Sequence, residues 1–316
     1  MRSLDLANAA FLDAGSQRDS TRQFGWILSE LERYRSLGVF TFKPIVAAAP
    51  SGELMNIYFQ ESDPPVMTHS NLYDGVDDGS LKLRDGANSN IYVAIPFTQD
   101  NVDYRTPIAM SVMVSRVGTP VNTASDRPPN ISFSIIADVG GNPDPGLTSL
   151  GDSYKLATAD ISTSLQEILI GWEGINVDIA KTTQYWLVIE GEYDEDASNC
   201  IQIHYNTVVG TSDCRYYDTS WNAMASEDVW FKLFQLTFED VSGDEIDEGG
   251  NIPAWQSDIL PVNSLDTLTV RTLNLMQRKS YIRVRYEFSN VPSGLWFPFI
   301  IGVVGDAIDP PVLPIS

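Results

Sequence analysis

Thr182-Thr-Gln-Tyr-Trp-Leu-Val-Ile-Glu-Gly191 is the most strand-like stretch of this 316-residue chain. Its centre consists of aromatic, aliphatic and β-branched side chains, and Gly191 ends the run. A short apolar run between polar residues is typical of a strand that is covered on both faces. Such a strand needs neighbours on both sides, and we expect one β-sandwich built around it. The candidate neighbours are residues 131–139, 167–172, 200–205 and 229–238.

Turn-forming residues separate the other apolar runs, and the chain contains 22 Gly and 18 Pro. Many short apolar runs between Gly, Pro, Asn and Asp favour an all-β fold, here a jelly roll or related β-sandwich. A small β unit is expected at the C-terminus. The expected division is an N-terminal arm, helix and short strands in 1–80, the jelly roll in 81–240, an acidic linker in 241–252 and the C-terminal β unit in 253–316.

One amphipathic helix is expected near the N-terminus. Ser20 and Gln23 have the spacing of a capping box, and Gly38 suits the helix end. Apolar residues at helical spacing form a single face, which consists of Phe24, Ile27, Leu28 and Leu31. A lone helix is not stable in water, so this one packs on its own chain or on another subunit. Phe24, Ile27 and Leu31 are therefore candidate interface residues.

The formal net charge is −22, from 42 acidic and 20 basic residues. Nucleic acid and anionic membranes are disfavoured as partners, because both need clustered Lys and Arg. No run approaches the length of a membrane span, and the residues after Arg2 do not resemble a signal peptide. We expect a protein made in a host cytoplasm without export, which is compatible with a virion component released by lysis.

The C-terminal part concentrates basic residues: Arg271, Arg278, Lys279, Arg283 and Arg285. Arg283 and Arg285 lie two apart on an expected strand, so they share a face. With the apolar Trp296 and Phe297, the residues Arg271, Arg283 and Arg285 are candidate interface residues for an acidic partner surface. The alternative is that these bases neutralise the acidic residues of 239–248 within the same chain.

Cofactor sites are weakly indicated. Cys200 and Cys214 are expected as free thiols, with a bridge as the alternative. Neither His69 nor His204 has a second histidine at ligand spacing, so a zinc site is unsupported. Three carboxylates could share a calcium ion, although their spacing is not that of an EF-hand and Asp-Gly pairs also form ordinary turns. They are Asp74, Asp77 and Asp78.

Three aromatic residues in a polar stretch, Tyr216, Tyr217 and Trp221, are candidates for sugar stacking, with Asp218 and Asn222 beside them. The alternative is packing under a loop or at an interface, where Tyr and Trp are enriched. Glu190 with Glu192, or Asp194 with Asp196, could form a glycosidase pair, but acidic runs at strand ends are usually solvated. No nucleophile elbow or P-loop occurs, and we expect no enzyme activity.

Three stretches resemble a recurrent jelly-roll module of the carbohydrate-binding type. Residues 131–146 resemble its strand and Gly- and Pro-rich turn, residues 183–191 its central strand, and residues 221–234 its closing strand. Such modules occur in structural proteins of tailed-phage virions and in bacterial surface proteins. The resemblance covers about half of the chain and carries no catalytic residue.

The function expected from the resemblance and the charge is that of a non-enzymatic structural component of a tailed-phage virion. It would be a decoration, fibre-anchoring or tail-associated protein that binds other virion proteins and copies of itself. Two alternatives stay open. The first is a carbohydrate-binding adhesin or receptor-binding module that contacts a cell-surface glycan, and the second is a polysaccharide-degrading enzyme.

Overall fold

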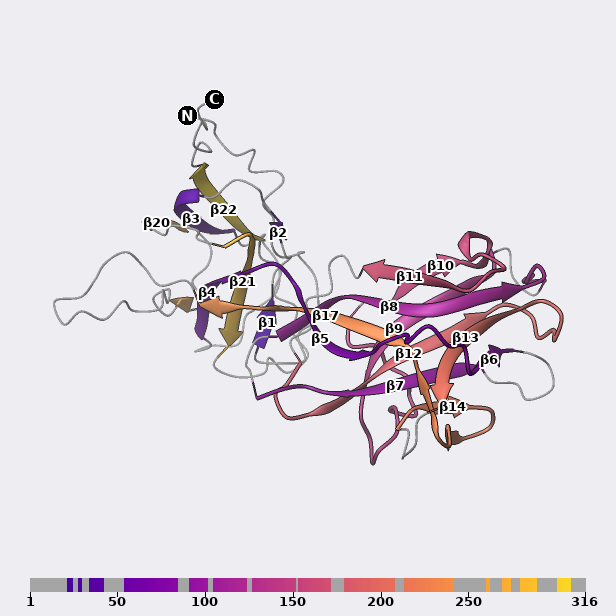
Figure 1. Cartoon of the computed structure of the whole chain (residues 1–316). Coiled ribbons are helices and arrows are strands. Elements are labelled where there is room, and N and C mark those ends of the chain that lie inside the picture. Colours follow the sequence, from indigo (N-terminus) through magenta and orange to yellow (C-terminus); the bar gives the residue numbers. More distant parts are fainter. Residues whose placement is uncertain are drawn as a thin grey trace, which may run out of the picture. The chain divides into compact units, whose positions relative to one another are not determined.

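The computed structural model describes the following residues (Figure 1): 22–24, 28–29, 34–42, 54–84, 91–101, 105–123, 127–151, 153–171, 179–207, 213–240, 260–261, 269–273, 279–288 and 300–307. The regular secondary structure of these residues is almost entirely β-strand, which confirms the all-β prediction. The helix within this part of the chain is a single 3-10 turn, η2 (Thr158–Asp160). Within the described segments, no helix has the length and apolar character needed to cross a membrane.

The chain divides into two compact units, and one is inserted into the other. Unit 2 is Pro65–Leu236, whereas unit 1 combines Met1–Pro64 with Thr237–Ser316. The division differs from the expected one in two ways. The sandwich already begins at Pro65, since the strands β5 (Val66–Asn71) and β6 (Gly79–Leu83) belong to it. The two ends of the chain pair with each other in one unit.

Unit 2 is built from two antiparallel sheets. The sheet that contains β12, called the β12 sheet, has the strand order β10 (Tyr154–Ala157), β9 (Asn130–Ala137), β12 (Gln184–Glu192), β7 (Tyr92–Thr98), β14 (Arg215–Tyr217) and β15 (Trp221–Ala223). The β8 sheet has the order β16 (Glu227–Val229), β13 (Cys200–Thr207), β8 (Arg105–Val117), β17 (Phe231–Thr237) and β5 (Val66–Asn71). Two further strands join it: β11 (Gln166–Gly171) pairs with β8, and β6 (Gly79–Leu83) pairs with β13.

The opening stretch forms β12, which has a partner on each side as expected. Its neighbours are β7 and β9. Only residues 131–139 among the four candidate neighbours pair with it, because the other three lie in the β8 sheet. In a sandwich, strands that follow one another in sequence often change sheets, and apolar content alone does not reveal which sheet a strand joins.

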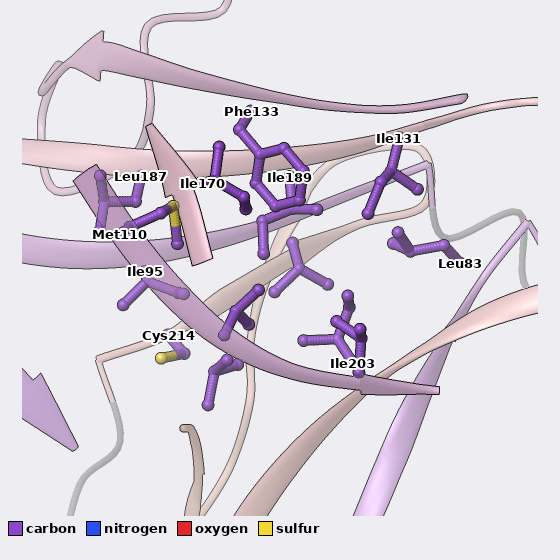
Figure 2. Packing of buried hydrophobic residues seen from close by; sticks show 14 of the residues in the cluster. Leu83, Ile95, Met110, Ile131, Phe133, Ile170, Leu187, Ile189, Ile203 and Cys214 are labelled. Atoms are coloured by element: carbon purple, nitrogen blue, oxygen red, sulfur yellow. The ribbon is translucent and has the colours of Figure 1, made fainter. Parts of the chain in front are cut away.

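The core of unit 2 lies between the two sheets (Figure 2). Leu187 and Ile189 of β12 project into it, together with Phe133 from β9, and they meet Met110 and Ile203 from the β8 sheet. Trp186 and Val188 point the other way. They form a second, smaller buried cluster with Ala94 and Ile136 on the outer face of the β12 sheet. The central strand is therefore covered on both faces, as its sequence predicts.

Unit 1 pairs strands from the two ends of the chain. In one sheet, β21 (Tyr281–Phe288) pairs with β4 (Leu54–Ser62) along the whole of β21, and four short strands complete the sheet: β1 (Arg22–Phe24), β2 (Leu28–Ser29), β18 (Glu239–Asp240) and β19 (Leu260–Pro261). In a second sheet, β3 (Tyr34–Phe42) lies between β20 (Thr269–Leu273) and β22 (Ile300–Ala307).

The prediction of an N-terminal helix is wrong for those residues of the segment that the structure describes. Phe24 lies in β1 and Leu28 in β2, and both strands pair with β21. The chain from Tyr34 onward is strand β3. Helical spacing of apolar residues is a weak preference, and pairing with β21 satisfies the same backbone groups through tertiary contacts. Ile27 and Leu31, the other two candidate interface residues of this segment, lie outside the described residues.

Candidate functional site

A continuous row of side chains crosses the outer face of the β12 sheet. Directly opposed residues in neighbouring strands point to the same face. The ladder register pairs Trp221 with Tyr217, Tyr217 with Tyr92, Tyr92 with Glu190, Glu190 with Ser132, and Ser132 with Lys155. The core residues Val93, Ile131 and Ile189 alternate with this row and face inward. We call these six residues the cross-strand row.

One end of the cross-strand row is aromatic. The ring centroids of Tyr92 and Tyr217 are 5.7 Å apart, those of Tyr217 and Trp221 5.2 Å, and those of Tyr92 and Trp221 6.1 Å. All three side chains are half-buried. Of the predicted sugar-stacking residues, the structure therefore brings Tyr217 and Trp221 together. Tyr216 points the other way and packs against the core.

The Asp218 and Asn222 side chains form hydrogen bonds within the turn between β14 and β15. Asp218 accepts hydrogen bonds from the backbone N–H groups of Thr219 and Ser220 and, at 3.0 Å, from the Asn222 side-chain amide. These hydrogen bonds hold the pKa of Asp218 below its usual range. The turn therefore fixes the hairpin that carries Tyr217 and Trp221.

The other end of the cross-strand row is polar. The Tyr92 hydroxyl donates to the Glu190 carboxylate, and the Ser132 hydroxyl lies 3.4 Å from the same carboxylate. Burial raises the pKa of Glu190, and the charge of Glu192 raises it further. Glu192 itself pairs with Lys155, whose Nζ lies 2.5 and 2.7 Å from its two oxygens. Glu190 and Glu192 are thus neighbouring carboxylates in different environments, since Glu190 is buried and Glu192 pairs with a lysine.

A cavity of about 330 Å³ opens over this polar end. Its lining includes three bases and three acids: Arg84, Arg127, Lys155, Glu190, Glu192 and Asp194. Asn122, Pro128 and Tyr193 complete the lining. The Arg84 Nε donates to the Gly191 carbonyl at 2.5 Å, and the Asp194 carboxylate accepts from the Thr123 hydroxyl at 2.6 Å. Glu190 and Glu192, suggested by the sequence as a pair, therefore share one cavity.

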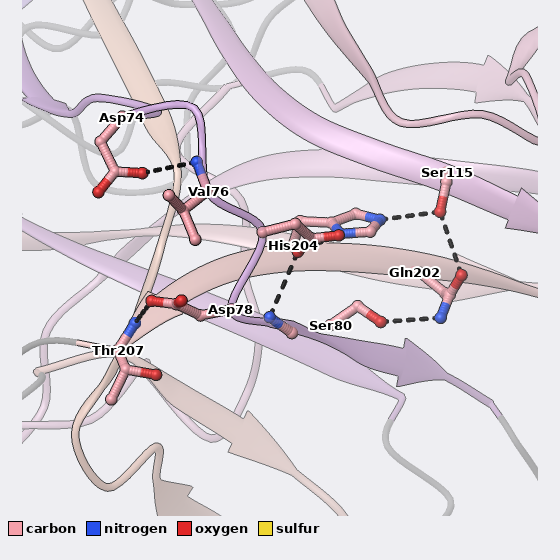
Figure 3. Close-up of polar contacts among 10 residues, drawn as sticks. Asp74, Val76, Asp78, Ser80, Ser115, Gln202, His204 and Thr207 are labelled. Carbon is pink, nitrogen blue, oxygen red and sulfur yellow. Dashed lines mark hydrogen bonds and ion pairs between the residues drawn. The ribbon is translucent and has the colours of Figure 1, made fainter.

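A second polar arrangement lies on the outer face of the β8 sheet and was missed by sequence reasoning (Figure 3). The His204 Nε2 lies 2.8 Å from the Ser115 Oγ, and its Nδ1 lies 3.1 Å from each oxygen of Asp77. The Ser115 hydroxyl also lies 3.1 Å from the Gln202 side-chain oxygen, and Gln202 donates to Ser80 at 2.8 Å. The three central residues come from distant parts of the sequence. The pairing of β8 with β13 brings Ser115 near His204, and Asp77 lies in the segment just before β6, which also pairs with β13.

Asp77, His204 and Ser115 have the connectivity of a Ser-His-Asp triad, which is recognised by geometry and not by sequence order. A carboxylate only accepts, so the His204 Nδ1–H donates to Asp77. Ser115 is only 4% exposed and His204 6%. Ser115 also lies inside a paired strand, opposite Gln202. Burial and position favour a structural role, in which the imidazole fastens the segment before β6 to β13.

The three carboxylates proposed for calcium accept hydrogen bonds from groups around them. Asp74 accepts from the Val76 N–H at 3.0 Å, and Asp78 accepts from the Thr207 N–H at 2.6 Å (Figure 3). Asp77 contacts His204 and the Gly79 N–H. Across the described part of the chain, no group of three or more His, Cys, Asp or Glu side chains is placed to hold a metal ion. Cys200 and Cys214 are separate, buried thiols.

Two basic residues of unit 1, Arg283 and Lys279, contact groups of the same unit. Arg283 is fully buried, its Nε donates to the Gln60 side-chain oxygen at 2.8 Å, and its guanidinium lies 4.0 Å from the centre of the Phe238 ring. Lys279 pairs with Asp63 at 3.0 Å and with Glu239 at 2.9 Å. The prediction that Arg283 docks a partner is corrected by its burial within unit 1.

The remaining interface candidates are placed only in part. Arg285 lies on β21 opposite Tyr58, and Arg271 lies on β20 opposite Val39. Phe24 lies on β1 opposite Arg285. Trp296 and Phe297 lie outside the described residues. The Lys279–Glu239 pair favours the alternative in which bases of this region neutralise acidic residues of the same chain.

No protein-family model and no curated protein matches the chain. Among solved structures, the chain is similar to the infectious bursal disease virus VP2 subviral particle, with 10% identity and a TM-score of 0.17 over 92% of this chain and 67% of that chain. The infectious bursal disease virus Gx strain gives 10% identity and a TM-score of 0.16 over the same shares. TM-scores this low do not show a shared fold.

Proposed function

We propose that this protein is a non-enzymatic structural component of a virus particle, which acts by binding copies of itself and other particle proteins. The observation that carries the proposal is a concentration of exposed apolar side chains in unit 2. Five of the eight exposed large apolar residues in the described part of the chain fall between Val66 and Val76. They are Val66, Met67, Leu72, Tyr73 and Val76, which we call the apolar strip.

The position of the apolar strip suits a protein–protein contact. β5, which carries Val66 and Met67, is the last strand in the order of the β8 sheet. Sheet edges and exposed apolar patches are common sites of association between chains. Val76 is 57% exposed and Leu72 50%. Burial of such side chains against a partner would supply affinity to a chain whose charge of −22 otherwise favours separation.

The His204 network supports the same proposal. Hydrogen bonds that Asp74, Asp77 and Asp78 accept fix the segment that carries Leu72, Tyr73 and Val76. Tyr73 also stacks edge-on against Trp230 at 4.4 Å. A segment that is already ordered loses less conformational entropy when it binds. The apolar strip is therefore presented in a preformed shape.

The finer assignment is to a tailed bacteriophage, as a decoration, fibre-anchoring or tail-associated protein located in the virion. It rests on the resemblance of residues 131–146, 183–191 and 221–234 to the jelly-roll module of phage structural proteins. The nested connectivity fits this role, since the inserted sandwich is joined to unit 1 by two chain segments instead of one. The assembly role requires no cofactor.

A polysaccharide-degrading enzyme is the second candidate function. The observation that favours it is the pair Glu190 and Glu192 in one cavity, with the pKa of Glu190 raised by burial and Glu192 paired with Lys155. Glycosidases use two carboxyl groups whose environments give them different proton affinities. Chromatography of oligosaccharides after incubation with the protein tests this candidate, and chain shortening that Glu190→Gln abolishes would establish it.

The assembly proposal is tested on particles of the virus that encodes this chain. Particles are purified by density-gradient centrifugation, and peptides of this chain and of an abundant host cytoplasmic protein are quantified across the gradient. We expect peptides of this chain to keep a constant ratio to the other particle proteins through the particle band. A ratio that falls in parallel with the host protein would contradict the proposal.

A further inference from the structure

We propose that β5 pairs with the β5 strand of a second copy of this chain, antiparallel and across a two-fold axis. The inference rests on the proposed assembly role and specifies how two copies meet at the apolar strip. Three observations support it: the open edge of β5 within the described residues, the absence of charge on this strand, and the exposed apolar side chains around it.

β5 is an exposed edge strand. In the described part of the chain it pairs with β17 on one side and ends the strand order. No backbone group of β5 bonds to a described turn or loop, and none of its six residues is buried. Every second residue of an antiparallel strand directs its N–H and C=O groups away from the neighbour that it already has. These groups match the backbone of one further strand.

The edge lacks the charged side chains that usually prevent strand addition. Native edge strands are commonly protected by Lys, other charged residues or Pro, and β5 has the sequence Val-Met-Thr-His-Ser-Asn. The His69 side chain turns toward the core, with its Nε2 2.8 Å from the Thr98 carbonyl oxygen and its ring against Phe97. The edge strand β11, which pairs with β8, carries Glu167 instead.

An uncharged strand suits a second copy of an acidic chain. Each copy has a formal charge of −22, so two copies meet most easily where a surface holds no acidic residue. A basic partner would be attracted to the acidic parts of the surface and not to β5. Antiparallel pairing of two identical edges also closes the contact, because each copy supplies the strand that the other needs.

Side-chain hydrogen bonds hold β5 ready for pairing. The Thr68 hydroxyl donates to the Gln235 side-chain oxygen at 2.7 Å, where the register between β5 and β17 shifts. The Asn71 side-chain amide donates to the carbonyl oxygens of Asp228 and Val229, each at 3.1 Å. An edge that is already ordered loses less conformational entropy when a further strand binds to it.

Antiparallel pairing also brings the apolar side chains of the two copies together. When the two strands overlap in full, Met67 opposes Ser70 of the second copy, and Val66 opposes its Asn71. The exposed Val66 of one copy then lies next to Leu72 of the other, which is also exposed. Six paired residues extend about 20 Å. Burial of the apolar side chains adds affinity to the modest net contribution of the backbone hydrogen bonds.

The test is disulfide cross-linking in the full-length protein. Met67→Cys and Ser70→Cys are made in two forms of different mass, so that mixed dimers separate on a non-reducing gel after mild oxidation. Directly opposed residues have Cβ atoms about 5 Å apart, whereas the two copies of Met67 would lie about 10 Å apart, too far for a disulfide. Val139→Cys is the control for chance collision, because Val139 is exposed and lies outside β5.

Wild-type protein gives the background, since its Cys200 and Cys214 are buried. We expect a cross-linked dimer in the mixture of Met67→Cys with Ser70→Cys, and none above background in either variant alone or in Val139→Cys. Circular dichroism and thermal melting establish that each variant is folded.

A pair of charge variants tests the same edge without cross-linking. Ser70→Glu places a carboxylate on β5, and Leu169→Glu is the matched control, because it adds the same charge to an exposed position of β11. We expect Ser70→Glu to raise the Kd of the dimer at least about tenfold, since a charged side chain on an edge strand opposes strand addition. Leu169→Glu should leave the Kd unchanged. Sedimentation velocity measures both values.

The proposal is overturned if the mixture cross-links no better than Val139→Cys, or if Met67→Cys alone cross-links as well as the mixture. It is also overturned if Ser70→Glu associates like the wild type. Oligomers that form without a cross-link between positions 67 and 70 would remove the strand pairing and leave assembly through the apolar strip in place. Loss of the chain from purified particles would instead contradict the proposed function.

Discussion

At the scale of single residues, two glutamates of unit 2 differ in what their surroundings do to a proton. Burial and the nearby charge of Glu192 raise the pKa of Glu190. Hydrogen bonds from Lys232 and Ser111 lower the pKa of Glu167, with the Lys232 Nζ 2.6 Å from its carboxylate. The two residues should therefore affect stability in opposite directions as the pH changes.

Glu190 binds a proton more tightly in the folded protein than in the unfolded chain. Its contribution to the free energy of unfolding is fully present below about pH 4.3, the ordinary carboxyl pKa, and is lost as the pH rises through the raised folded pKa. We expect Glu190→Gln to gain stability relative to the wild type over that rise. Urea denaturation of both proteins at a series of pH values measures the difference.

Glu167→Gln is the matched comparison, with the opposite sign. The lowered pKa of Glu167 gives stability that is present above the ordinary carboxyl pKa and lost as the pH falls through the folded value. The Gln variant should therefore lose stability relative to the wild type as the pH rises through the same region. Equal pH profiles for the two variants would show that their environments do not differ as described.

His204 has a structural role in this account. Ser115→Ala and His204→Ala should each lower the free energy of unfolding by about 1–3 kcal/mol, because each leaves a buried polar partner unsatisfied. A fluorophosphonate probe should not label Ser115, since that hydroxyl is 4% exposed. Mass spectrometry of the treated protein measures the labelling. Labelling of Ser115 that His204→Ala abolishes would instead identify a nucleophile.

At the scale of single elements, β12 should contribute much of the stability of unit 2, because its side chains are buried on both faces. Trp186 is fully buried, its Nε1 donates to Asp138 at 2.7 Å, and the Arg215 guanidinium lies 5.8 Å from its ring. Trp186→Ala should lower the free energy of unfolding by about 3–5 kcal/mol, as truncations of large buried aromatic residues do. Chemical denaturation measures the loss, with the half-buried Trp221→Ala as control. An unchanged midpoint for Trp186→Ala would contradict the assignment of β12 as the central strand.

The elements also show how much of the fold the sequence predicts. The composition of residues 185–189 predicts a strand covered on both faces, and that prediction is confirmed by β12. Helical spacing from Phe24 to Leu31 predicts a helix, and the described part of this segment is strand instead. Short segments have weak intrinsic preferences, so the availability of β21 as a partner decides their structure.

The candidate sites depend on register, which composition does not encode. Tyr217 and Trp221 stand out in the sequence as aromatic residues in a polar stretch. Tyr92, Ser132 and Lys155 do not, because only the pairing of β7, β9 and β10 in the β12 sheet brings them into the row. Ser115 meets His204 for the same reason, because β8 pairs with β13. The basic cluster in the sequence also did not predict that Arg283 is buried.

At the scale of the whole molecule, the chain forms two units, and one is inserted into the sequence of the other. Unit 1 closes on itself through β4 and β21, which come from opposite ends of the chain, while unit 2 folds as a continuous segment with its own core. Within unit 2, the apolar strip belongs to the β8 sheet side and the cross-strand row to the β12 sheet. One sandwich thus carries the proposed assembly surface and the cross-strand row on different sheets.

The central claim is that the apolar strip drives association, and sedimentation velocity over a wide range of protein concentration tests it most directly. The double variant Leu72→Asn, Val76→Thr makes the strip polar and leaves the Tyr73–Trp230 contact in place. The control Val121→Thr, Val139→Thr changes two exposed valines elsewhere in unit 2. We predict that wild type and control form oligomers as concentration rises, whereas the strip variant stays monomeric with unchanged melting. A wild type that is monomeric at every concentration, or a strip variant that associates like the wild type, would contradict the account.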